Sequence, residues 1–147
     1  MRTNVTYTDF YIAVDVVGWD DSLDQAFGIL ARVREPGLGT TDGYALSYQT
    51  GNPGNPGLQI SVITNEVPSM AQPTNNNIGT VRLSPTNTYR LVFLGRGTNL
   101  EGRVYLASDL SHPLENLSAI PKLPMVEGHL ERKLDRLLKR LSVLQGN

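Results

Sequence analysis

The feature that most constrains this chain is an alternation of apolar and polar side chains with a period of two residues. In residues 5–17, apolar side chains occupy every second position from Phe10 to Val16, and β-branched residues are frequent. Such a pattern predicts β-strands, in which successive side chains point to opposite faces. The same alternation predicts further strands at residues 25–34, 44–49, 58–63, 88–94 and 100–107, and a shorter one at 80–83. Residues 68–79 are polar and are predicted to be an exposed loop.

Turn-forming residues separate these segments. Pro36-Gly37 follows one predicted strand, Asp42-Gly43 precedes the next, and Asn52-Pro53-Gly54 lies in the following connection. Proline cannot donate to a ladder and glycine accepts positive φ angles, so both end strands. Connections of hairpin length favour antiparallel sheets. The chain is therefore predicted to be mainly β, with antiparallel sheets packed as a sandwich.

The pattern changes near the C-terminus. Leucines there follow one another at steps of four, three, four and three residues, which predicts an amphipathic α-helix with a heptad-like stripe. They are Leu130, Leu134, Leu137, Leu141 and Leu144. The predicted organisation is a β-sandwich domain at 1–117, a linker at 118–126 and the helix at 127–147. So short a helix is marginal alone, so it is expected to pack on its own sandwich, on a partner helix or on copies of itself.

Composition excludes several classes of protein. The chain of 147 residues has no cysteine, which excludes disulfides and thiolate metal sites. Its net charge of −1 gives no electrostatic reason to bind nucleic acid. No segment approaches the roughly 20 apolar residues of a membrane span, and the first residues lack the apolar core of a signal peptide.

Several segments resemble concanavalin A-like (LamG-type) jelly-roll domains of secreted bacterial proteins, over about residues 5–114. The resemblance lies in Phe-Gly-Ile-Leu-Ala-Arg at 27–32 before Asp-Gly-Tyr at 42–44, and in Tyr-Arg-Leu at 89–91 before Leu-Glu-Gly-Arg-Val-Tyr at 100–105. It implies a lectin-like jelly roll, an extracellular or cell-surface location and carbohydrate binding. The chain departs from the family in lacking the first and the closing strands, so we expect edges of its sandwich to be uncovered.

Four side chains are candidates for glycan binding. Aromatic faces can stack on sugar rings, and Trp19 lies in a predicted loop. Tyr44 and Tyr48 share one strand face with Leu46, so core packing is the alternative for both rings. Arg90 lies opposite an apolar stripe, as do Arg32 and Arg103, and is expected on an outer sheet surface.

Three acidic residues form the one candidate metal site. Asp20, Asp21 and Asp24 are close in sequence and could supply oxygens to Ca²⁺. Aspartates in such segments more often make turns, which is the alternative reading. No other cofactor is expected.

Three functions remain open at the level of sequence. The leading one is a non-catalytic binding module, with glycan as the ligand. The second is a structural protein that self-assembles through its C-terminal helix. The third is a degenerate glycoside hydrolase-like domain, although the chain lacks the paired carboxylates on one strand that such an enzyme needs, so no catalytic residue is assigned.

Overall fold

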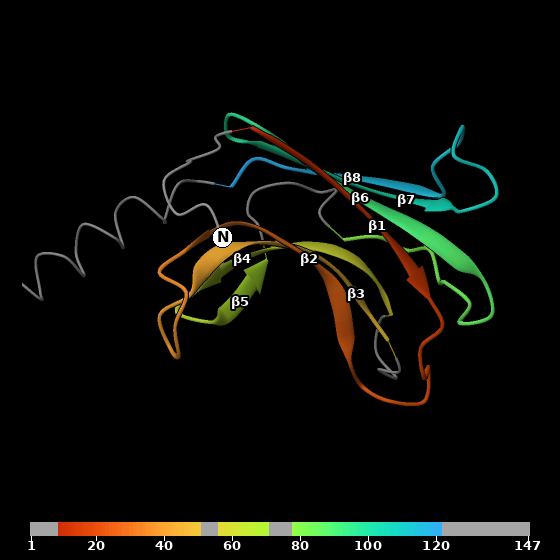
Figure 1. Ribbon diagram of the computed structural model, residues 1–147, viewed down its shortest axis with the longest axis horizontal. Coiled ribbons are helices and arrows are strands. Elements are labelled where there is room, and N and C mark those ends of the chain that lie inside the picture. The colour runs from red at the N-terminus through yellow and green to blue at the C-terminus, as the bar shows by residue number, and fades with distance from the viewer. Residues whose placement is uncertain (1–8, 51–55, 71–77, 122–147) are drawn as a thin grey trace, which may run out of the picture.

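The computed structural model describes residues 9–50, 56–70 and 78–121, which form two four-stranded antiparallel sheets. Figure 1 shows them as two layers. The first sheet has the order β1 (Phe10–Val17), β6 (Thr88–Arg96), β7 (Asn99–Leu106) and β8 (Glu115–Ala119). The second sheet has the order β2 (Ala26–Arg34), β3 (Asp42–Gln49), β4 (Gly57–Thr64) and β5 (Val67–Met70). The predicted antiparallel β architecture is confirmed.

The core lies between the two sheets and consists of alternate residues from most strands. Leu46, Ile60, Leu91 and Phe93 are fully buried in it. Gly102 lies on the same inner face, where a Cβ atom would come 2.3 Å from Leu46 Cδ1. The missing side chain at this position therefore lets a leucine of the opposite sheet fill the core.

Six of the predicted strands are confirmed, and the structure adds two. Three of the four residues of β5 lie in the segment predicted to be an exposed loop, and β8 extends past residue 117, the predicted end of the β domain. β8 also means that the first sheet has a closing strand after Leu114, where the sequence comparison with jelly-roll domains suggested none. Both new strands are short, which weakens any periodic signal.

The predicted strand at residues 80–83 is wrong. Side chains, rather than a neighbouring strand, accept the backbone N–H groups of this segment. The Glu115 carboxylate accepts from Thr80 N at 2.7 Å, and the Tyr48 hydroxyl accepts from Leu83 N at 2.9 Å. Because side chains satisfy these groups, the segment can cross the end of the sandwich without a ladder.

The alternation in β2 breaks at Arg32, against the prediction that this side chain faces outward. A register shift lies between Ala31 and Arg34, and Arg32 has a φ of 50°. Its guanidinium lies 5.4 Å from the ring centroid of Phe10 and 5.9 Å from that of Tyr44. A β-bulge of this kind re-aims side chains, so Arg32 contacts aromatic rings of both sheets while Val33 is exposed.

The predicted C-terminal helix and its five leucines lie outside the described residues. Within the part of the chain that the structure describes, no helix is long and apolar enough to cross a membrane.

Candidate functional site

Tyr44 and Tyr48, two candidates for sugar stacking, are core residues. Their exposed fractions are 2% and 0%. Burial raises the pKa of the Tyr48 phenol, which therefore stays protonated, and its oxygen accepts the hydrogen bond from Leu83 N. The structure thus agrees with the core-packing alternative, and neither ring presents a face to solvent.

Trp19 caps one end of this core. Its ring centroid lies 5.1 Å from that of Phe27 and 6.0 Å from those of Tyr48 and Tyr89. The indole Nε1 donates to Asp21 Oδ1 at 3.2 Å. The side chain is half-buried and held by an aromatic cluster, so its main contribution is to packing.

The three aspartates of the predicted Ca²⁺ site bind different partners. Asp20 accepts from the backbone and hydroxyl of Ser22, as in an Asx turn, and the first of these bonds is 3.0 Å long. Asp21 pairs with Arg82 at 3.0 Å, and Asp24 accepts from Gln49 Nε2 at 2.8 Å. Among residues 9–50, 56–70 and 78–121, no three His, Asp or Glu side chains converge as metal ligands. The contacts of Asp20 match the turn-forming alternative, whereas Asp21 and Asp24 bind side chains that are remote in sequence.

Arg90 is the one candidate that lies on an outer sheet surface, as predicted. It comes from β6 and forms a two-pronged ion pair with Asp15 of β1, with Nε–Oδ1 and Nη2–Oδ2 distances of 2.7 and 2.8 Å. These hydrogen bonds lower the pKa of Asp15 and raise that of Arg90. Both side chains are part-exposed, and the fork geometry fixes them in one orientation.

A second ion pair lies on the same surface of β7. Arg103 Nε donates to Glu101 Oε1 at 2.7 Å, and Arg103 Nη1 lies 3.5 Å from the Tyr105 hydroxyl. In the ladder, Tyr105 pairs with Arg90, which pairs with Asp15. The two charged pairs therefore lie in adjacent strands on one face.

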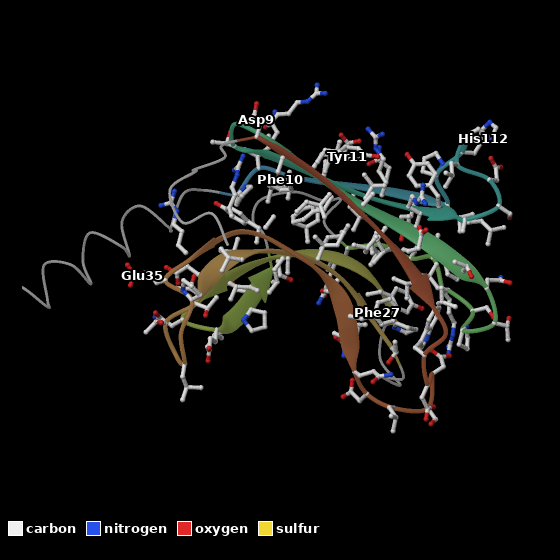
Figure 2. All side chains as sticks on the ribbon, viewed as in Figure 1. Asp9, Phe10, Tyr11, Phe27, Glu35 and His112 are labelled. Carbon is white, nitrogen blue, oxygen red and sulfur yellow. The ribbon has the colours of Figure 1, made fainter. Side chains whose placement is uncertain are left out.

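Tyr11 completes this surface. Its neighbour Phe10 packs edge-on against Phe93 in the core, so Tyr11 points to the opposite face, where it is 67% exposed (Figure 2). Standard strand spacings place the Cα atoms of Tyr11 and Tyr105 about 16 Å apart. We call this surface the tyrosine–arginine face; its residues are Tyr11, Asp15, Arg90, Glu101, Arg103 and Tyr105.

Sequence reasoning did not select Tyr11 or Tyr105. Both alternate with apolar residues, but alternation alone does not say which face of a strand is buried. The usable signal is the cross-strand register, because charged residues in neighbouring strands share a face with these tyrosines. That register becomes known only once the strands are paired.

Asp109, Ser111 and His112 are also close together, in the connection before β8. The Ser111 hydroxyl lies 2.8 Å from His112 Nδ1 and also binds Asp109. A hydrolytic triad requires the serine and the carboxylate to bind different nitrogens of the imidazole, whereas here Ser111 Oγ and Asp109 Oδ2 both approach His112 Nδ1, the carboxylate at 3.5 Å. The backbone N–H of Ser111 donates to the same carboxylate at 3.0 Å, as in an exposed Asx turn.

Comparisons of the chain with family models, with curated proteins and with solved structures found no match.

Proposed function

We propose that the protein is a non-catalytic glycan-binding module whose ligand lies on the tyrosine–arginine face. The observation that carries the proposal is the exposed ring of Tyr11 on the same strand face as the Asp15–Arg90 ion pair. A tyrosine ring offers an apolar surface to the C–H groups of a sugar. The neighbouring carboxylate and guanidinium offer acceptors and donors for its hydroxyls.

The rigidity of the polar groups supports this use of the face. Each arginine is already held by a carboxylate, Arg90 by Asp15 and Arg103 by Glu101. Side chains that are ordered before binding lose less conformational entropy when a ligand arrives. A short oligosaccharide along the sheet would meet a tyrosine at each end and the two ion pairs between them.

The acidic side chains near the sheets support a non-catalytic role. Asp15 and Glu101 are bound to arginines, and Glu115 accepts backbone N–H groups of the segment at residues 80–81. A glycoside hydrolase needs one carboxyl group that can be protonated and a second across a cleft. Ion pairing instead keeps Asp15 charged, because it lowers the pKa of that group.

The test is an array of plant, microbial and animal oligosaccharides, followed by titration calorimetry with the best ligand. We expect Tyr11→Ala to weaken binding at least about tenfold, as removal of a main aromatic contact does. The matched control is Val67→Ala on β5, because Val67 has a similar exposed fraction, 65%, but lies on the other sheet.

Either of two results would contradict the proposal. One is the absence of binding by the wild-type protein to any glycan of the array. The other is a glycan whose affinity is the same for the wild type and Tyr11→Ala. Trp19→Phe serves as a further control, because the ring of Trp19 packs on the core and its replacement should leave affinity unchanged.

Self-assembly through the C-terminal residues is a second function that we propose. The heptad-like spacing of five leucines favours it, together with five basic and three acidic residues in 127–147 that fill the intervening positions. In the full chain, Leu134→Glu with Leu141→Glu should lower the molar mass in solution measured by light scattering. An unchanged oligomer would contradict this function.

A further inference from the structure

The four strands at the sheet edges differ in how well they resist pairing with another chain. β5 has only four residues and contains Pro68, β8 has five residues, and β2 carries a bulge at Arg32. Short length, proline and bulges all protect an edge. β1 has eight residues, Phe-Tyr-Ile-Ala-Val-Asp-Val-Val, with no proline, glycine, lysine or bulge. Among the strands that the structure describes, it is the one long, regular and mainly apolar edge.

The backbone groups on the outer edge of β1 can be identified from the ladder. Ala107 N donates to Thr88 O, so even-numbered residues of β6 bond to β7 and odd-numbered ones bond to β1. The odd-numbered residues of β6 pair with even-numbered residues of β1, such as Val14 opposite Leu91. Odd-numbered residues of β1, such as Ala13, therefore direct their N–H and C=O groups away from the sheet.

The core is also less covered at β1 than at the opposite edge of the same sheet. In β8, the inward side chains of Leu117 and Ala119 are fully buried. In β1, Phe10, Ile12 and Val16 face the core but are only half-buried, and Val14 is 37% exposed. One more strand beside β1 would satisfy the outward backbone groups and cover these side chains.

We propose that β1 pairs antiparallel with β1 of a second copy of this chain. A twofold axis through Ala13 would bring the smallest outer side chain against itself. On the inner face, Phe10 would meet Val16 of the second copy and Ile12 would meet its Val14, so that aromatic and β-branched side chains pair. The Asp15 carboxylates of the two copies should repel each other little, because each forms an ion pair with Arg90 of its own chain. The twofold axis at Ala13 also places each Asp15 opposite Tyr11 of the other copy, so the two carboxylates are not adjacent.

This pairing goes beyond the proposed glycan binding and does not depend on it. It would join two first sheets into one eight-stranded sheet and place two tyrosine–arginine faces side by side. A ligand with repeated sugar units could then engage both faces, which raises the apparent affinity without new contacts.

The decisive experiment compares two proline variants of the full chain by light scattering and circular dichroism. Both variants carry Leu134→Glu and Leu141→Glu, which removes association through the C-terminal leucines. In this background Ala13→Pro removes an N–H group that points away from the sheet, so we expect a folded monomer in place of a dimer. Val14→Pro removes an N–H group that points to β6, so we expect a large loss of thermal stability. The two substituted positions are adjacent in β1, but one N–H group faces the free side of the strand and the other faces β6.

A cysteine pair gives a second readout that needs no proline. The chain has no cysteine, so Ala13→Cys introduces the only thiol. We expect this variant to form a disulfide dimer under mild oxidation faster than Ser118→Cys, which places a thiol on the exposed face of β8. A monomeric wild type would overturn the proposal, and so would equal oxidation rates or a dimer that survives in the folded Ala13→Pro variant with both leucine substitutions. A dimer lost only with the substitutions at Leu134 and Leu141 would overturn it too and assign assembly to the C-terminal residues.

Discussion

Tyr48 and Tyr11 lie in strands with the same alternating pattern, yet their rings have opposite environments. Tyr48 is fully buried between the sheets, whereas Tyr11 lies on the outer face of the first sheet. The hydroxyl of Tyr48 holds the segment that crosses the end of the sandwich. The ring of Tyr11 is exposed instead and shares its strand face with the Asp15–Arg90 ion pair. One residue type is thus part of the core on the inner face and exposed to solvent on the outer face.

The difference shows what decides the role of an aromatic residue in a sandwich. Alternation groups side chains by face, but the packing of the second sheet makes one of those faces the interior. The inner tyrosines sit beside Leu46, Leu91 and Phe93. The outer ones sit beside arginines and carboxylates, which remain hydrated and paired. Substitutions should therefore affect stability on one face and binding on the other.

The largest expected effect separates the two faces directly. Tyr48→Ala should lower the free energy of unfolding by about 3–5 kcal/mol, because it leaves a cavity in the core. Tyr11→Ala should change it by less than about 0.5 kcal/mol, since its ring is mostly hydrated. Urea unfolding followed by fluorescence measures both. Equal effects of the two substitutions would show that the outer face carries part of the packing.

A smaller effect on stability is expected when only the tyrosine hydroxyl is removed. Tyr48→Phe keeps the ring but leaves the buried Leu83 N–H without its acceptor, at a cost of about 1–3 kcal/mol. Tyr105→Phe is the matched control, because its hydroxyl lies on the outer face near Arg103. Thermal unfolding of both variants gives the comparison. A Tyr48→Phe variant as stable as the wild type would show that the hydrogen bond from Leu83 N to the Tyr48 hydroxyl does not stabilise the fold.

The smallest effect concerns the pH dependence of the outer face. The hydrogen bonds from Arg90 lower the pKa of Asp15 below its ordinary value of 3.8. A carboxylate with a lowered pKa in the folded state stabilises the protein above that ordinary value, and the contribution is lost as pH falls through the folded pKa. Wild-type stability should therefore decline slightly more than that of Asp15→Asn in this acidic range.

The urea midpoint at about pH 7 and about pH 3 measures this decline. Asp15→Asn with Arg90→Gln is the control, because it should show the same pH dependence as Asp15→Asn alone. A double variant that differs from the single one would indicate that Arg90 acts through another acid.

Most of the strands follow from residue pattern. The alternation from Phe10 to Val17 predicts β1 and the two sets of side chains that share a face, although the predicted segment began at residue 5 and β1 begins at Phe10. β5 and β8 were not predicted, because a strand of four or five residues is too short to show a clear alternation of apolar and polar side chains. The supposed strand at 80–83 failed for another reason. Its N–H groups bond to Glu115 and Tyr48, which are remote in sequence.

The candidate site followed from the sequence only in part. Arg90 was placed correctly on an outer surface, but its partner Asp15 lies 75 positions away and was not connected with it. The bulge at Arg32 moved that side chain to the joint between the sheets, which a regular alternation could not predict.

The local conformational preferences of this chain are strong. Its β-branched residues favour extended backbone and its turn-forming residues favour chain reversal, each within a few positions. Those short-range effects place most strands and turns and sort side chains into two sets. The choice of inner and outer set depends on contacts between residues far apart in the sequence, such as Phe10 with Phe93 and Leu46 with Gly102. Only the packing of one sheet on the other removes one set from water, and that step separates the buried tyrosines from the tyrosine–arginine face.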